Sequence, residues 1–272
     1  MTESIEHALG EEHIAGCLAL SVAANWNQNE ADWRLMLALG HGWGISLDDG
    51  TLVASTLVLP YGGFAWISMV LVLPGHRRKG HASHLLRVAL DDLRASRLKP
   101  VLDATPDGRE VYRQEGFQDT WTFKRFALRG SANIVNGRAQ LPLGWRKALE
   151  LDANAFGGDR EWLLRALQKR LPHAALGTPE GFVLGRDGRE ASQIGPLVAR
   201  DEATAMELLG QALARVPGPI YADVADHAPR MQEWLLQRGF ELQRPFTRMV
   251  HGGGRAPGDE KLVYLVAGPE LG

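Results

Sequence analysis

The sequence has little cysteine, no long apolar run and no excess of positive charge. Cys17 is the only cysteine among 272 residues, so no internal disulfide can form, which suits a reducing compartment. No run of about 18 apolar residues is present, which predicts that no helix spans a membrane. The formal net charge is −2, whereas proteins that bind nucleic acid or anionic membranes carry an excess of Lys and Arg. We therefore expect a cytoplasmic protein that binds neither nucleic acid nor membrane.

Residues 66–90 combine a short apolar run, a basic loop with glycine, and a helical pattern. The run Ile67–Leu73 is apolar, ends at Pro74 and is typical of a buried strand. Basic residues and Gly80 follow, and apolar residues then recur at helical spacing up to Leu90. The first turn of a helix has N–H groups without internal partners, and glycine lets an anion approach them closely. The pattern predicts a phosphate-binding loop, although neither a P-loop nor a dinucleotide-binding G-x-G-x-x-G motif is present.

The loop Arg77-Arg78-Lys79-Gly80-His81-Ala82 resembles the R/Q-x-x-G-x-G/A motif of the GNAT superfamily of acetyl-CoA-dependent N-acyltransferases, and Val72-Leu73-Pro74 resembles the V-x-P before it. The resemblance implies acetyl-CoA as cosubstrate, with its pyrophosphate on the loop and its pantetheine along the strand. It implies no metal. The residues expected to bind the cosubstrate are Val70, Leu71, Val72, Arg77, Arg78, Lys79, Gly80, His81, Ala82 and Ser83.

A second motif, Tyr112-Arg113-Gln114-Glu115-Gly116-Phe117, resembles the Y-x-x-x-G-F segment that closes the cosubstrate site in this superfamily. The resemblance implies that Tyr112 is the general acid, because a phenol can protonate the leaving thiolate. It also implies that a backbone N–H near Met69–Leu71 stabilises the oxyanion.

The general base is less clearly marked in the sequence. Many superfamily members have a Glu on the central strand, where this chain has Ser68 and Met69. Asp103, on the predicted strand after the helix, is one candidate, and His41 is another. A chain of waters, or an amine that is already partly neutral, is an equal alternative.

Two predicted helices, Glu12–Trp26 and Glu30–Leu39, flank a short polar segment. In the superfamily such a segment forms a wall of the acceptor pocket, so Trp26, Asn27 and Trp33 are candidates for contacts with the acceptor. The alternative is that both tryptophans belong to the hydrophobic core. The expected partner is a small-molecule or peptide amine, and a homodimer is compatible with the resemblance.

The second half of the chain repeats the first in outline. Arg113–Phe117 corresponds to Leu236–Phe240, where the glycine and phenylalanine are retained. At the position of the phosphate loop, however, Arg200–Thr204 contains two carboxylates and no glycine, and Leu235 stands where the first half has Tyr112. Carboxylates would repel a pyrophosphate, and leucine cannot donate a proton. We therefore expect the second unit not to bind CoA productively.

The predicted fold class is α/β (α+β), with two tandem GNAT-like domains. Each is expected to be a mixed, mostly antiparallel sheet flanked by helices and splayed at its central strand to admit CoA. The predicted boundaries are a catalytic domain at 1–130, a linker at 131–144 and a degenerate domain at 145–272 that completes the acceptor pocket. A D-x-x-x-F-G-x-D-R run similar to that of tandem acyltransferases contains Asp152, Phe156, Gly157, Asp159 and Arg160. Asp159, Arg160 and His227 are expected to reach the acceptor pocket, or else to serve as ion pairs and helix caps.

Two functions follow from these features. The first is an N-acetyltransferase in which a primary amine attacks acetyl-CoA directly in a ternary complex. The second is a protein that binds acyl-CoA, or docks a partner, without catalysing transfer. The absence of a strand carboxylate favours the second function, and Tyr112 favours the first.

Overall fold

A computed structural model describes residues 4–132 and 143–272 of the chain. The predicted linker 131–144 therefore lies mostly outside the described residues. The described strands form one 12-stranded sheet in the order β1-β2-β3-β4-β5-β11-β6-β10-β12-β9-β8-β7. Only the pairs β4–β5 and β9–β10 are parallel. The prediction of an α/β (α+β) fold with a mostly antiparallel, helix-flanked sheet is confirmed.

The first half of the chain contains six strands and four α-helices within the described residues. They are β1 (Ser4–Ala8), α1 (Ile14–Ala23), α2 (Glu30–Leu39), β2 (His41–Leu47), β3 (Leu52–Pro60), β4 (Phe64–Val72), α3 (His81–Ala95), β5 (Lys99–Ala104), α4 (Pro106–Gln114) and β6 (Phe117–Leu128). β1 was not predicted, because this short edge strand is polar and largely exposed and lacks an alternating apolar pattern.

The second half repeats much of this order. Its elements are α5 (Trp145–Phe156), α6 (Glu161–Arg170), β7 (Leu176–Thr178), β8 (Gly181–Arg186), β9 (Ser192–Ala199), α7 (Glu202–Leu213), β10 (Ile220–Ala225), α8 (Pro229–Leu236), β11 (Glu241–His251) and β12 (Val263–Leu265). None of the helices in the described parts of the chain is both long and apolar enough to cross a membrane.

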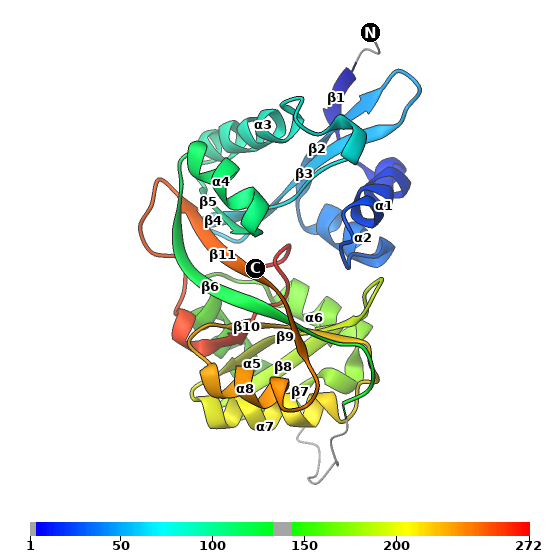
Figure 1. Cartoon of the computed structure of the whole chain (residues 1–272). Helices are drawn as coiled ribbons and strands as arrows, with labels where there is room; N and C mark the ends of the chain where they lie inside the picture. The colour runs from blue at the N-terminus through cyan, green and yellow to red at the C-terminus, as the bar shows by residue number, and fades with distance from the viewer. Residues whose placement is uncertain (1–3, 133–142) are drawn as a thin grey trace.

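The two halves exchange strands. β11, from the second half, pairs with β5 and β6 of the first half, and β6 in turn pairs with β10 of the second half. Figure 1 shows β6 and β11 as long neighbouring strands that run from the upper half of the molecule to the lower. Instead of one sheet per unit, the halves share a single sheet. Pairing between residues more than 100 positions apart has no local sequence signal, so the sequence did not predict the exchange.

The hydrophobic core is also continuous across the two halves. One cluster of buried side chains contains Trp33 and Trp66 from the first half, and Phe156, Phe182 and Phe246 from the second. Segment 266–272 packs against this cluster, because the Tyr61 hydroxyl donates to the carbonyl of Leu271 and the Trp66 indole donates to the carbonyl of Pro269, each at 3.0 Å. Figure 1 places the C-terminus at the centre of the molecule, between the halves.

The sheet splays between β4 and β5, as predicted. These strands pair only over Phe64–Trp66, opposite Lys99–Val101, and then separate. Just beyond that point β4 bulges against β3, and Met69 has a φ of 52°. The Ser55 hydroxyl donates to the Met69 carbonyl at 2.7 Å and holds the bulge in place. A bulge re-aims the backbone and interrupts pairing, which leaves room between β4 and β5.

Candidate active site

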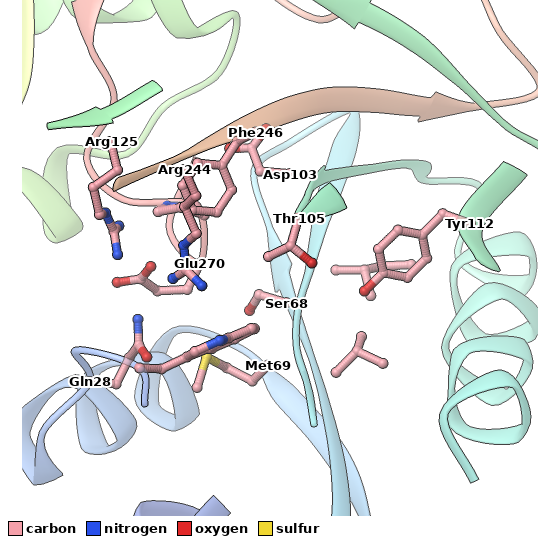
Figure 2. Close-up of a pocket in the computed structure, with 14 residues that line it drawn as sticks. Gln28, Ser68, Met69, Asp103, Thr105, Tyr112, Arg125, Arg244, Phe246 and Glu270 are labelled. Atoms are coloured by element: carbon pink, nitrogen blue, oxygen red, sulfur yellow. The ribbon is translucent and has the colours of Figure 1, made fainter. Parts of the chain in front are cut away.

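A cavity lies beside this splay, where the two halves meet. It is lined from both halves of the chain by Trp26, Gln28, Ile67, Ser68, Met69, Val70, Asp103, Thr105, Tyr112, Arg125, Arg244, Phe246, Pro269 and Glu270. Figure 2 shows Tyr112 on one side of the cavity, with Arg125, Arg244 and Glu270 on the other and Ser68 between them. The cavity therefore has a phenol at one end and a group of charged side chains at the other.

The basic loop precedes α3 at the open end of the splay. Gly80 has a φ of 84°, a conformation that side-chain-bearing residues rarely adopt, and open space surrounds its α-carbon. No side chain caps the N-terminus of α3, so the first-turn N–H groups at His81–Ser83 stay available to a ligand. Arg78 and Lys79 are exposed, and neither has an ion-pair partner within the described residues. These features fit the pyrophosphate of a CoA ester.

Tyr112 lies on α4 and lines the cavity, half-buried, with its ring edge-on to Phe117 at 6.0 Å between centroids. Burial raises the pKa of Tyr112 to about 12. The phenol therefore stays protonated at neutral pH and can donate a proton or a hydrogen bond. This is the property that a general acid for a thiolate requires.

Asp103 also lines the cavity, but its carboxylate is already engaged. Both oxygens accept hydrogen bonds from Arg248, each at 2.9 Å, and the aspartate side chain is fully buried. The guanidinium of Arg248 is held between Trp66 and Trp121, 4.4 and 4.3 Å from their ring centroids. A carboxylate whose two oxygens already accept hydrogen bonds from an arginine has less capacity to take a proton from an amine. Asp103 as general base therefore stays a prediction.

His41 does not line the cavity. Its Nε2 lies 2.9 Å from a carboxylate oxygen of Asp92, and both side chains are partly exposed on the outer surface. His41 is therefore not placed to take a proton from a substrate in this cavity.

Of the three predicted acceptor contacts, only Trp26 lines the cavity. The Asn27 side chain donates to the carbonyl of Ala191 at 2.9 Å and accepts from the N–H groups of Glu190 and Ala191, so it joins the two halves. Trp33 is fully buried, and its indole donates to the hydroxyl of Ser21 at 3.0 Å. Asn27 and Trp33 thus have packing roles, in line with the alternative considered for Trp33.

The D-x-x-x-F-G-x-D-R run forms a structural ion pair outside the cavity. Arg160 donates to both oxygens of Asp152 at 2.9 Å, with both side chains buried, and its guanidinium lies 3.9 Å from the ring centroid of Phe156. Asp159 accepts from the backbone of Glu161, and His227 packs against Tyr264. None of these predicted pocket residues lines the cavity.

In the second unit, the N-terminus of α7 is capped by its own chain. The Asp201 carboxylate accepts the N–H of Thr204 at 2.8 Å, and this bond lowers the pKa of Asp201. An ionised carboxylate therefore occupies the place where a phosphate would bind. Leu235, at the position of Tyr112, is fully buried in the core. That the second unit does not bind CoA productively stays a prediction.

Five charged or polar residues of the cavity were missed in the sequence, namely Gln28, Thr105, Arg125, Arg244 and Glu270. Arg125 and Arg244 lie on strands, and Glu270 lies in the segment after β12. No local signal marked them: Arg125 lies on a strand that also carries Asp119 and Lys124, so a charged residue there does not stand out in the sequence. Within the part of the chain that the structure describes, no cluster of His, Cys, Asp and Glu could hold a metal ion.

Comparisons with known proteins match both halves. The model of the acetyltransferase (GNAT) family matches residues 4–117, and that of an acetyltransferase (GNAT) domain matches residues 148–265. An uncharacterized N-acetyltransferase of Bacillus subtilis, YitH, is 22% identical over 249 residues, which cover 85% of this chain and 86% of YitH. A holothin acyltransferase of a Pseudoalteromonas species is 25% identical over 93% of this chain and 89% of its own.

Solved structures share the fold over nearly the whole chain. A putative acetyltransferase from Pyrococcus horikoshii has a TM-score of 0.79 at 21% identity, and the match covers 99% of this chain and 96% of that one. A GCN5-related N-acetyltransferase from Sphaerobacter thermophilus has a TM-score of 0.64 at 14% identity, covering 94% and 98%. The shared architecture therefore includes both halves.

Proposed function

Because the chain belongs to the GNAT superfamily of acyltransferases, with one GNAT unit in each half, we propose that it transfers an acetyl group from acetyl-CoA to a primary amine. The observation that carries the proposal is the arrangement of the first unit. That unit combines an uncapped helix N-terminus with a basic loop, an open splay between β4 and β5, and a protonated phenol in the cavity wall. The second unit has neither the loop nor the phenol.

In the proposed reaction the amine nitrogen attacks the thioester carbonyl carbon, so that a C–N bond forms and the C–S bond breaks. Tyr112 donates its proton to the departing thiolate, and the proton that the nitrogen gives up to the base returns to the phenolate through solvent, so the products are the amide and free CoA thiol and the enzyme is restored. In this proposal the backbone N–H groups at the Met69 bulge stabilise the oxyanion, and the bulge, with a φ of 52° at Met69, supports the assignment.

We propose that Glu270 takes the proton from the amine. Glu270 is buried in the cavity wall, and among the described residues only its Oε1 accepts a hydrogen bond, from Arg186. Both oxygens of Asp103, by contrast, are held by Arg248. A carboxylate with one oxygen directed to a partner retains acceptor capacity on the other.

The test is calorimetric titration of acetyl-CoA into the wild type and into the double variant Arg77→Glu/Gly80→Asp. The variant replaces one cation and one open glycine by carboxylates at the phosphate loop. We expect affinity to fall at least thirty-fold, about 2 kcal/mol, because charge-assisted hydrogen bonds to the pyrophosphate are lost and like charges are introduced. Equal affinity in both proteins would mean that this loop does not hold the cosubstrate.

A matched variant checks the second unit. Glu202→Gln/Ala203→Gly alters the corresponding stretch at α7 and should leave acetyl-CoA affinity unchanged, because Asp201 still caps that helix. Thiol release from acetyl-CoA is then followed with a panel of amines. Binding without thiol release on any amine would favour the acyl-CoA sensor over the transferase.

A further inference from the structure

Two arginines lie side by side on neighbouring strands in one wall of the cavity. Arg244 on β11 lies directly opposite Arg125 on β6 in the strand register. Both guanidinium groups approach the ring of Phe246, at 5.0 Å for Arg244 and 5.3 Å for Arg125. Like charges directly opposite each other on neighbouring strands destabilise a sheet. The pair therefore needs an explanation beyond folding.

The neighbouring arginines all have carboxylate partners. Arg125 donates two bonds of 2.7 Å to Asp223, which also accepts from Gln193. Arg248 is held in the same way by Asp103, and Arg186 binds both Asp32 and Glu270. Each pair joins the two halves or lies at their junction.

Arg244 is the exception. Its side chain has no hydrogen bond or ion pair to any residue that the structure describes, and its Nε is fully buried without a partner. Burial and the neighbouring Arg125 lower the pKa of Arg244 to about 10. Glu270 also faces Arg244 from the same wall, but it is bound to Arg186. The guanidinium of Arg244 is half-buried, lines the cavity and has no hydrogen-bonded carboxylate of its own among the described residues. It is arranged to receive an anion from a ligand.

We propose that Arg244 binds a carboxylate of the acceptor, so that the acceptor is an amino acid or another primary amine carrying a carboxylate. This inference rests on the proposed function. Figure 2 shows Arg244 and Glu270 on the side of the cavity away from Tyr112. A carboxylate bound there leaves the amine of the same molecule between Glu270 and Ser68–Val70, where the thioester would lie.

The charges of the cavity also disfavour cationic acceptors. Arg125 is paired with Asp223, so the unpaired guanidinium of Arg244 is the group that attracts an anion and repels a polyamine or a lysine-rich peptide. The specificity thus comes from the second half of the chain, which supplies Arg244 although its own cosubstrate site is lost.

The experiment measures thiol release from acetyl-CoA with a panel of amino acids and with the amines that share their side chains but have no carboxylate, such as phenylalanine and phenethylamine. The wild type should prefer the carboxylate-bearing member of a pair by about 100-fold in kcat/KM. In Arg244→Gln the KM for the amino acid should rise about 100-fold. The KM for the matched amine should stay within threefold of its wild-type value. Arg244→Lys should retain part of the preference.

The matched control is Arg238→Gln, which removes an exposed arginine outside the cavity. It should leave kcat/KM unchanged for both the amino acid and the matched amine. Equal use of both members of every pair, unaffected by Arg244→Gln, would overturn the inference while leaving the acetyltransferase intact. Succinyl-CoA with phenethylamine forms a further arm. If that reaction, rather than the amino acid reaction, depends on Arg244, the carboxylate belongs to the acyl group and our assignment to the acceptor is wrong.

A binding measurement separates failure of this inference from failure of the proposed function. N-acetylated amino acids, the expected products, should raise the melting temperature of the wild type but not that of Arg244→Gln. Without ligand, Arg244→Gln should melt at the same temperature as the wild type or higher, because it removes an unpaired charge beside Arg125. If no amine is acetylated, a shift that depends on Arg244 still supports the carboxylate site, and no shift in either protein overturns it.

Discussion

Tyr112→Phe is expected to lower kcat by roughly 10²- to 10⁴-fold, the range typical of losing a general acid. The ring would still pack against Phe117, so the affinity for acetyl-CoA should stay within about twofold. The measurement is steady-state thiol release, combined with calorimetry for the cosubstrate. A variant that turns over at the wild-type rate would remove Tyr112 from the mechanism.

The pKa of Tyr112 also predicts how kcat depends on pH. Its pKa of about 12 exceeds the usual value of 10, so the protonated, active form persists as the pH rises through 10. We expect no loss of kcat between pH 8 and 10.5 that can be assigned to an ionising tyrosine. The control Tyr264→Phe removes a hydroxyl outside the cavity and should leave kcat unchanged at every pH. A fall in wild-type kcat with a midpoint near 10, absent from Tyr112→Phe, would show that the phenol is less buried than in this structure.

Residues 1–132 are expected not to fold by themselves, although they correspond closely to the predicted catalytic domain. Without the second half, the place of β11 between β5 and β6 is empty. Three fully buried side chains of β11, Phe246, Met249 and Val250, are lost. At about 1.5–3 kcal/mol each, their burial amounts to a large part of a typical domain stability of about 5–15 kcal/mol. Asp103 also loses its partner Arg248 and becomes an unpaired buried charge.

Circular dichroism and amide NMR spectra of the 1–132 fragment provide the measurement. We expect poor dispersion and no cooperative unfolding for this fragment, and recovery of both when residues 145–272 are expressed with it. The intact chain should unfold in a single transition, because core and sheet are shared. A well-dispersed, cooperatively unfolding fragment would mean that the strand exchange is dispensable and that the halves are independent domains.

The parts of this protein that depend on contiguous residues could be predicted from the sequence. The strand, basic loop and helix around Gly80 follow one another directly, so apolar periodicity and turn chemistry were sufficient to place them. The same holds for Tyr112 on its short helix and for the loss of both features near Arg200 and Leu235. Their function depends on local backbone conformation, which a short stretch of sequence largely specifies.

Only the tertiary structure determined the charged end of the cavity. Arg125 and Arg244 become neighbours through a strand exchange, and Glu270 enters the same cavity from a segment that packs between the halves. Such contacts depend on strand register and burial over more than 100 residues of intervening chain, and neither is marked in any local pattern. Apolar periodicity therefore determined the strand, basic loop and helix around Gly80, and the resemblance to the GNAT superfamily indicated the fold class, whereas non-local strand pairing decided which charged side chains line the end of the cavity away from Tyr112.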